Sequence, residues 1–194
     1  MFKYFIINKP FNVLSQFSEE KNSTKKTLKS LYNFPSDVYP VGRLDADSEG
    51  LLIITNDKDL NQKILNPNKK LPKTYAVQVE GLIDDNAIND LKKGVEIKLK
   101  KGYYTTKPCE VKIIKPNFKD RNPPIRERKN VPTSWIEITI HEGKNRQVRK
   151  MTAKTGFPTL RLIRTDIGGL NINYLDNETV TELNADKLKN KLFK

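Results

Sequence analysis

The sequence has almost none of the residues on which disulfide and soft-metal chemistry depend. Its 194 residues include one cysteine, Cys109, and one histidine, His141. A single cysteine cannot form an internal disulfide bond, and these two residues cannot supply the ligand cluster of a zinc site. We therefore expect neither a disulfide framework nor a centre for a soft metal such as zinc. Cys109 lacks a nearby activating motif and is predicted to be buried or inert.

Long apolar runs and a balance of charge are also missing. The sequence contains no run of about 18 apolar residues, which is the length needed to span a membrane. It also lacks the apolar segment near Met1 that a secretory signal would have. The 36 Lys and Arg residues outnumber the 23 Asp and Glu residues, which gives a formal net charge of +13. Such an excess attracts polyanions, and no basic amphipathic helix indicates a membrane surface instead. We expect a cytoplasmic protein whose partner is nucleic acid.

Apolar patterning predicts an α+β fold with a mostly antiparallel sheet flanked by helices. The fully apolar run 51–54 is typical of a buried strand, and Ile136, Ile138 and Ile140 alternate as in a half-buried antiparallel strand. Proline-rich residues 116–132 are predicted to form an exposed basic loop. Further strands are expected over 2–8 and 74–79, and helices over 24–33, after Asp57, after Asp84, over 145–155 and from Asn184.

The first candidate site is the segment 42–50, which places an arginine and three carboxylates between two glycines, directly before the buried strand. A functional site is plausible there, although on these residues alone the segment could be an acidic surface turn with an incidental ion pair. It could also be a magnesium cluster formed by Asp45, Asp47 and Glu49, because carboxylate oxygens are the ligands that this ion prefers.

The second candidate site, residues 141–150, joins a strand to the start of a helix through Gly143. Backbone N–H groups at a helix N-terminus attract phosphate, and Arg146, Arg149 and Lys150 lie within about one turn of each other. Asn145 and Gln147 can both donate and accept hydrogen bonds, which suits base edges or ribose. The plainer interpretation is a solvated basic helix face.

Three ordered motifs carry a resemblance to a known family. They are Arg43-Leu44-Asp45 with Ser48 to Asp57, then Lys73-Thr74-Tyr75, then Gly143 to Met151. Together they resemble the RsuA family of ribosomal RNA pseudouridine synthases over about residues 3–172. The chain is most similar to the RluE branch, which modifies large-subunit ribosomal RNA. Many family members carry an S4 RNA-binding domain first. Here the first predicted strand begins at Phe2, so we expect one catalytic domain over 1–194 without an N-terminal S4 domain.

The resemblance implies roles for three residues. Asp45 would be the catalytic carboxylate, acting as nucleophile at C1′ or as base at C2′ of the ribose. Tyr75 would stack on uracil, and its hydroxyl would assist removal of the C5 proton. Arg149 would pair with Asp45 and keep it ionised and oriented. No cofactor is implied. The RNA-binding residues would be Arg43, Lys144, Asn145, Arg146, Gln147 and Lys150.

The expected activity is therefore isomerisation of a specific uridine to pseudouridine, most of all in 23S rRNA of the large subunit or its assembly intermediate. We expect a monomer with no membrane partner. Two alternatives stay open. A noncatalytic RNA-binding or ribosome-assembly protein could share the fold and the basic surface. An RNA uridine methyltransferase would need a cofactor site and usually a catalytic cysteine, and neither is visible in the sequence.

Overall fold

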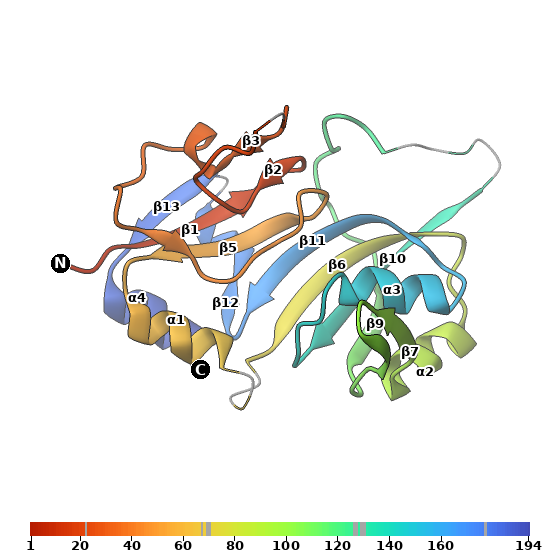
Figure 1. Cartoon of the computed structure of the whole chain (residues 1–194). Coiled ribbons are helices and arrows are strands. Elements are labelled where there is room, and N and C mark those ends of the chain that lie inside the picture. The colour runs from red at the N-terminus through yellow and green to blue at the C-terminus, as the bar shows by residue number, and fades with distance from the viewer. Residues whose placement is uncertain (22, 67, 69–70, 126–127, 129–130, 177) are drawn as a thin grey trace. The chain divides into compact units, whose positions relative to one another are not determined.

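A computed structural model describes residues 1–21, 23–66, 68, 71–125, 128, 131–176 and 178–194. The chain divides into two compact units (Figure 1). The first unit combines Met1–Leu71 with Arg164–Lys194, and the second is Pro72–Ile163. Strand β11 (Thr159–Ile167) contributes residues 159–163 to the second unit and residues 164–167 to the first.

The first unit holds both ends of the described chain. Its other strands are β1 (Tyr4–Lys9), β2 (Val13–Leu14), β3 (Lys26–Thr27), β4 (Tyr39–Pro40), β5 (Glu49–Thr55), β12 (Leu170–Asn171) and β13 (Val180–Leu183). Its helices are α1 (Lys58–Leu65), α4 (Ala185–Leu192) and the 3-10 helices η1 (Leu28–Ser30) and η2 (Ile172–Leu175). The strand order is β13-β1-β5-β11, and β4 and β12 pair with β5 and β11.

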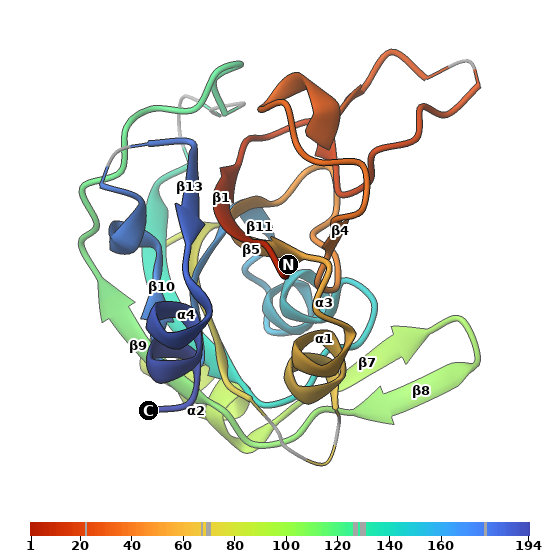
Figure 2. The same cartoon turned by 90° about the vertical axis from the view of Figure 1, so that its left-hand side faces the viewer.

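Both faces of the β1–β5 pair are buried. The two strands are antiparallel, with Ile6 opposite Ile53, and the face that carries these two side chains packs against α1 and α4 (Figures 1 and 2). Leu60 of α1 and Leu188 of α4 belong to the same core. Burial of each such side chain contributes roughly 1.5–3 kcal/mol. The apolar run 51–54 is a buried strand, as predicted, because elements cover it on two sides.

An aromatic cluster covers Phe5 and replaces one predicted helix. The rings of Tyr32 and Phe34 lie 5.8 and 5.3 Å from that of Phe5, and Phe17 packs on Phe34 at 5.5 Å. Residues 24–33, predicted to be a helix, instead form β3, which pairs in parallel with β2, and the single turn η1. That prediction was wrong because packing of the aromatic rings outweighs the helical spacing of a short segment.

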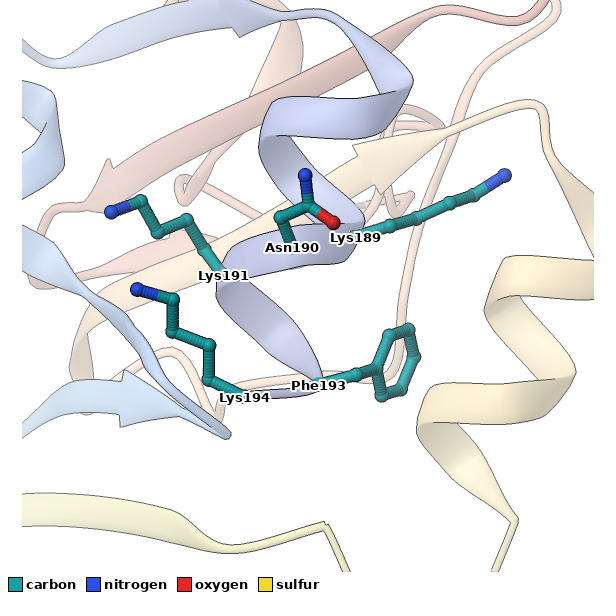
Figure 3. A pocket seen from close by; sticks show the side chains of 5 residues that line it. All are labelled: Lys189, Asn190, Lys191, Phe193 and Lys194. Carbon is teal, nitrogen blue, oxygen red and sulfur yellow. The ribbon is translucent and has the colours of Figure 1, made fainter.

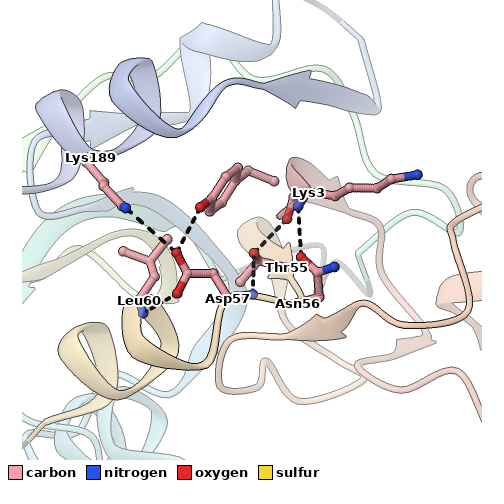
Figure 4. Close-up of polar contacts among 7 residues, drawn as sticks. Lys3, Thr55, Asn56, Asp57, Leu60 and Lys189 are labelled. Carbon is pink, nitrogen blue, oxygen red and sulfur yellow. Dashed lines mark hydrogen bonds and ion pairs between the residues drawn. The ribbon is translucent and has the colours of Figure 1, made fainter. Parts of the chain in front are cut away.

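The caps predicted from sequence are present. Asp57 accepts a hydrogen bond from the Leu60 N–H at 2.9 Å and so begins α1, and its other oxygen accepts the Tyr4 hydroxyl at 2.8 Å (Figure 4). Lys189 approaches the same oxygen at 3.8 Å. Burial alone would raise the pKa of Asp57, but these donors lower it below its ordinary value. Asp84 caps α2 (Asp85–Lys93) in the same way through the Ala87 N–H at 2.8 Å.

The second unit contains the remaining elements. They are β6 (Lys73–Glu80), α2 (Asp85–Lys93), β7 (Glu96–Leu99), β8 (Gly102–Thr105), β9 (Glu110–Ile114), β10 (Thr133–Ile140) and α3 (Gln147–Lys154). The strand order is β11-β6-β10-β9, and β10 is antiparallel to both β6 and β9. Ile136, Ile138 and Ile140 of β10 are buried, as their alternation predicted.

Strands β7, β8, β9 and β11 were not predicted from the sequence. Strands β7 and β8 form an antiparallel hairpin with Leu99 opposite Gly102, and Figure 2 shows it clearly. In contrast, the described part of residues 116–132 contains no helix or strand, in agreement with the predicted loop. The α+β class with a mostly antiparallel sheet is confirmed. No helix among the described residues has the length and apolar character needed to cross a bilayer.

Candidate active site

The segment 42–50, which we call the carboxylate loop, has a fixed backbone on each side of Asp45. The Ser15 hydroxyl donates to the Leu44 carbonyl at 2.8 Å and accepts from the Leu44 N–H at 3.1 Å. On the other side, the Ala46 carbonyl accepts the Asn12 N–H at 2.7 Å. The Asp45 carbonyl accepts the Ser48 N–H at 3.0 Å and closes a turn. The half-buried side chain of Asp45 therefore projects from a main chain that cannot shift easily.

A buried ammonium group lies beneath this loop. Lys9 ends β1 with 0% exposure, and its Nζ donates to the carbonyls of Pro10 at 2.9 Å, Val13 at 2.8 Å and Ala46 at 3.5 Å. Burial lowers the pKa of Lys9 to about 8, although the charges of Glu49, Asp47 and Asp45 oppose that change. Lys9 thus ties the end of β1 to the residue that follows Asp45.

The end of the carboxylate loop meets β11 at a glycine. Gly50 has a φ of +106°, and a Cβ atom there would collide with the backbone of Arg164. The close approach places Arg164, which is 4% exposed, beside β5, and its Nε donates to the Leu51 carbonyl at 2.8 Å. Only glycine fits both the conformation and the space at position 50.

The carboxylates of the loop are not grouped for metal binding. Among the described residues, no three His, Cys, Asp or Glu side chains gather as a metal site requires. The cluster of Asp45, Asp47 and Glu49 that the sequence allowed is therefore not formed. Glu49 belongs to β5 and is buried, whereas Asp45 and Asp47 are half-buried.

Tyr75 lies in the second unit, on β6, opposite Ile138 of β10. It is 8% exposed and its neighbours Ala76 and Val77 are buried as well. A tyrosine in a strand with this burial has a fixed ring, which is a requirement both for a core aromatic and for a stacking platform. The geometry of the strand alone is compatible with either role.

Residues 142–146, which we call the basic turn, connect β10 to α3 and are held at their base by a carboxylate. Glu142 accepts the Tyr104 hydroxyl at 2.6 Å, the Lys107 N–H at 2.9 Å and the Gln147 amide at 2.6 Å. The hydrogen bond from Tyr104 to Glu142 raises the pKa of that phenol. The Lys144 ammonium lies 4.6 Å from the centre of the Tyr104 ring.

Helix α3 begins later than expected. It starts at Gln147 rather than Asn145, because Arg146 adopts a left-handed backbone with a φ of +51°. Gln147 is buried, and its side-chain oxygen accepts the Lys144 N–H at 2.9 Å, so the contact of this residue with RNA stays a prediction. Lys144, Asn145 and Arg146 are exposed.

The structure distributes the predicted site residues over both units. Asp45 and the exposed Arg43 belong to the first unit. Tyr75, the basic turn and the half-buried Arg149 and Lys150 of α3 belong to the second. Each of the three sequence motifs lies within one unit. The pairing of Arg149 with Asp45 remains a prediction from the resemblance.

Sequence reasoning assigned no role to Lys9, Ser15 or Asn12. The motif Asn8-Lys9-Pro10 was a signal for Lys9, since a lysine at the end of an apolar strand requires buried carbonyl partners. Cys109 fits its prediction: its thiol donates to the Leu91 carbonyl at 3.0 Å, and burial raises its pKa to about 11. In the 116–132 loop, Arg126 lies outside the described residues.

Comparison with known proteins gives the class of the chain. The family model described as RNA pseudouridylate synthase matches residues 3–154. This match covers well over half of the sequence, so the chain belongs to the RNA pseudouridylate synthase family. Members of this class are isomerases, which agrees with the activity expected from the three motifs.

Individual relatives show which members of the family the chain is similar to. The chain is 49% identical to "Ribosomal large subunit pseudouridine synthase E" of Vibrio parahaemolyticus, covering 89% of this chain and 70% of that protein. It is 46% identical to the protein of the same name in Xanthomonas axonopodis pv. citri, covering 88% of both. A crystal structure of a pseudouridylate synthase, 25% identical, matches with a TM-score of 0.78 over 99% of this chain and 74% of that one. These similarities confirm the predicted family.

Proposed function

We propose that this protein isomerises a specific uridine to pseudouridine in 23S ribosomal RNA of the large subunit. Membership of the pseudouridylate synthase family and the names of the relatives in Vibrio and Xanthomonas support this substrate. The observation that carries the proposal is the carboxylate loop, in which hydrogen bonds fix the main chain directly before and after Asp45. A carboxylate held in this way is suited to a reaction at one ribose carbon.

The reaction breaks the bond between N1 and C1′, turns the uracil and joins its C5 to C1′. Asp45 acts on the ribose, either as the nucleophile that bonds to C1′ or as the base that removes the C2′ proton. Tyr75 holds the detached uracil by stacking. After C5 bonds to C1′, the C5 proton leaves with the help of the Tyr75 hydroxyl and N1 gains a proton, so the product has the mass of the substrate.

The basic residues supply binding and electrostatics. Arg149 orients the Asp45 carboxylate and balances its charge. Extruding a stacked uridine costs a few kcal/mol, and phosphate contacts offset that cost. The proposed contacts come from Arg43, Lys144, Asn145, Arg146, Gln147 and Lys150. We further propose that the protein acts as a monomeric single catalytic domain in the cytoplasm, on rRNA or a partly assembled subunit.

The test is release of tritium from large-subunit rRNA labelled at uridine C5, in a chelator-treated reaction without any methyl donor. Isomerisation releases the label to water and leaves the RNA mass unchanged. A methyltransferase would release it only with a methyl donor and with a gain in mass. Absence of release from naked, folded and partly assembled RNA alike would favour a noncatalytic RNA-binding or ribosome-assembly protein on the same fold.

A further inference from the structure

The two flanks of helix α4 differ in how their charges are used. Leu188 and Leu192 face the core and separate these flanks. On one flank, Lys189 lies 3.8 Å from Asp57 and joins the network that caps α1. On the other flank, lysines recur at a spacing of four and then three residues, at 187, 191 and 194. Lys187 and Lys191 lie one turn apart on α4, and Lys194 follows the end of the helix, so we call the three the second stripe.

This second stripe surrounds a tyrosine. The Lys191 ammonium lies 4.6 Å from the centre of the Tyr174 ring, which belongs to η2. A hydrogen bond from Lys191 is the main cause that lowers the pKa of the Tyr174 phenol, and the charges of Lys194 and Lys187 add to it. The four residues therefore lie close enough to share one electrostatic environment, which we call the lysine–tyrosine cluster.

The positive charge of the cluster is not neutralised by neighbours. Within the described ranges, no side-chain carboxylate lies within 4.0 Å of the ammonium groups of Lys187, Lys191 or Lys194. The helix dipole explains only part of the stripe, because it favours Lys191 in the last turn but not Lys187. Cations are favoured at a helix C-terminus, but Lys187 lies in the first turn of α4, where a positive charge is unfavourable.

The end of α4 also borders an open cavity of about 720 Å³. Its lining residues are Lys189, Asn190, Lys191, Phe193 and Lys194, and Figure 3 shows Lys191 and Lys194 projecting side by side on one side of the helix. The volume lies in the range of sites that accept nucleotide-sized groups. Tyr174 remains 36% exposed beside Lys191. Exposed rings between lysines are typical of surfaces that bind nucleic acid.

We propose that the lysine–tyrosine cluster binds the phosphodiester backbone of the RNA substrate, at phosphates other than those contacted by the basic turn. The three ammonium groups pair with phosphate oxygens, and the Tyr174 hydroxyl donates to one of them. The proposal rests on the proposed function, because it takes the same RNA as the partner. It predicts that α4 adds affinity without taking part in the isomerisation.

The test compares two triple variants with the same change in charge. The first is Lys187→Gln, Lys191→Gln and Lys194→Gln, and the control is Lys25→Gln, Lys26→Gln and Lys29→Gln, three exposed lysines of the same unit. Dissociation constants for a large-subunit rRNA fragment are measured from about 50 to about 300 mM salt. We expect the α4 variant to bind about tenfold more weakly and to lose roughly 2 from its salt slope, while its kcat at saturating RNA is unchanged.

Equal dissociation constants and slopes for the two triple variants would overturn the proposal. Tyr174→Phe, which keeps the lysines, should weaken binding about twofold, as expected for one lost hydrogen bond to a phosphate. The proposed function is tested separately, by tritium release from the unmodified protein. If that release occurs and the α4 variant binds RNA normally, only the α4 proposal fails. If release never occurs, only the proposed function fails, because binding is measured independently of turnover.

Discussion

The carboxylate loop and the basic turn both present charged side chains on a short connection, but they are fixed in different ways. In the loop, main-chain hydrogen bonds hold the residues before and after Asp45, and a buried ammonium lies underneath. In the turn, the Glu142 carboxylate fixes the base, while Lys144, Asn145 and Arg146 project into solvent. Bond-making chemistry needs a fixed position, whereas flexible side chains are sufficient for phosphate contacts. The difference predicts that loop residues govern turnover and turn residues govern affinity.

The largest effect is expected for Asp45→Asn. The change keeps the size of the side chain and removes its negative charge, so the ribose is no longer attacked or deprotonated. Turnover should fall by at least about 10³-fold, with RNA affinity changed less than threefold. Single-turnover tritium release and filter binding measure the two quantities. Measurable turnover by this variant would show that Asp45 is not the catalytic carboxylate. The proposed difference between the carboxylate loop and the basic turn would then be wrong.

Tyr75→Phe tests whether a buried residue in the same unit as the basic turn affects turnover rather than affinity. Loss of the hydroxyl should lower turnover by roughly 10²-fold or more, in the range of general acid–base contributions, while the ring still stacks. The measurement is kcat and KM for tritium release. A near-normal kcat would reduce Tyr75 to a stacking platform.

On helix α3, two neighbouring cations should have different roles: Arg149 should affect turnover, and Lys150 should affect RNA affinity. Arg149→Ala is expected to lower kcat about 10²-fold, because a charged partner of the reacting carboxylate is lost. Lys150→Ala, a matched loss of one charge on the next residue, should change kcat less than threefold and mainly raise KM. Equal small effects on kcat would make α3 an ordinary basic surface.

How much of this could be predicted depends on how local each signal is. Caps at Asp57 and Asp84 and the alternation of Ile136, Ile138 and Ile140 were correctly predicted, because they depend on residues within one element. The missed features are long-range. The hydrogen bond from Ser15 to Leu44 spans 29 positions of the sequence, and the one from Lys9 to Ala46 spans 37. A pattern within one segment cannot predict such contacts. The prediction of a helix over 24–33 was wrong for the same reason, because packing against the distant Phe5 ring fixes the conformation of this segment.

Lys9→Met tests whether the buried ammonium supports the loop. Lys9 has a native pKa of about 8, below the ordinary 10.5, so the native state loses this proton before the unfolded state does. The titration of Lys9 should therefore raise the free energy of unfolding above about pH 8, by about 1.5 kcal/mol between pH 8 and 9.5 relative to the Lys9→Met variant. The Met variant should lack that rise in urea titrations. Tyr4, whose pKa is raised to about 12, lowers stability only above about pH 10, and Cys109, whose pKa is raised to about 11, lowers it above about pH 9; both act equally in the two proteins, so the difference between them reports Lys9.

The activity of this variant gives a second readout. Ala46 loses one donor, so kcat should fall about tenfold at pH 7, where Lys9 is protonated, even if stability is little changed. Parallel stability curves for the two proteins would show that the ammonium is not destabilised by burial. A kcat equal to that of the unmodified protein would show that Asn12 and Ser15 suffice to hold the loop.

The smallest effect is expected for Glu142→Gln, at the base of the basic turn. The amide keeps the shape of the carboxylate but loses its charge, and only one of the two oxygens that accept these three hydrogen bonds remains. RNA binding should weaken about threefold, because the turn is less well fixed, and kcat at saturating RNA should stay the same. Tyr104→Phe removes one of these donors and serves as the matched control, with a smaller loss of affinity. A drop in kcat for Glu142→Gln, with affinity unchanged, would place the turn with the carboxylate loop as part of the chemistry.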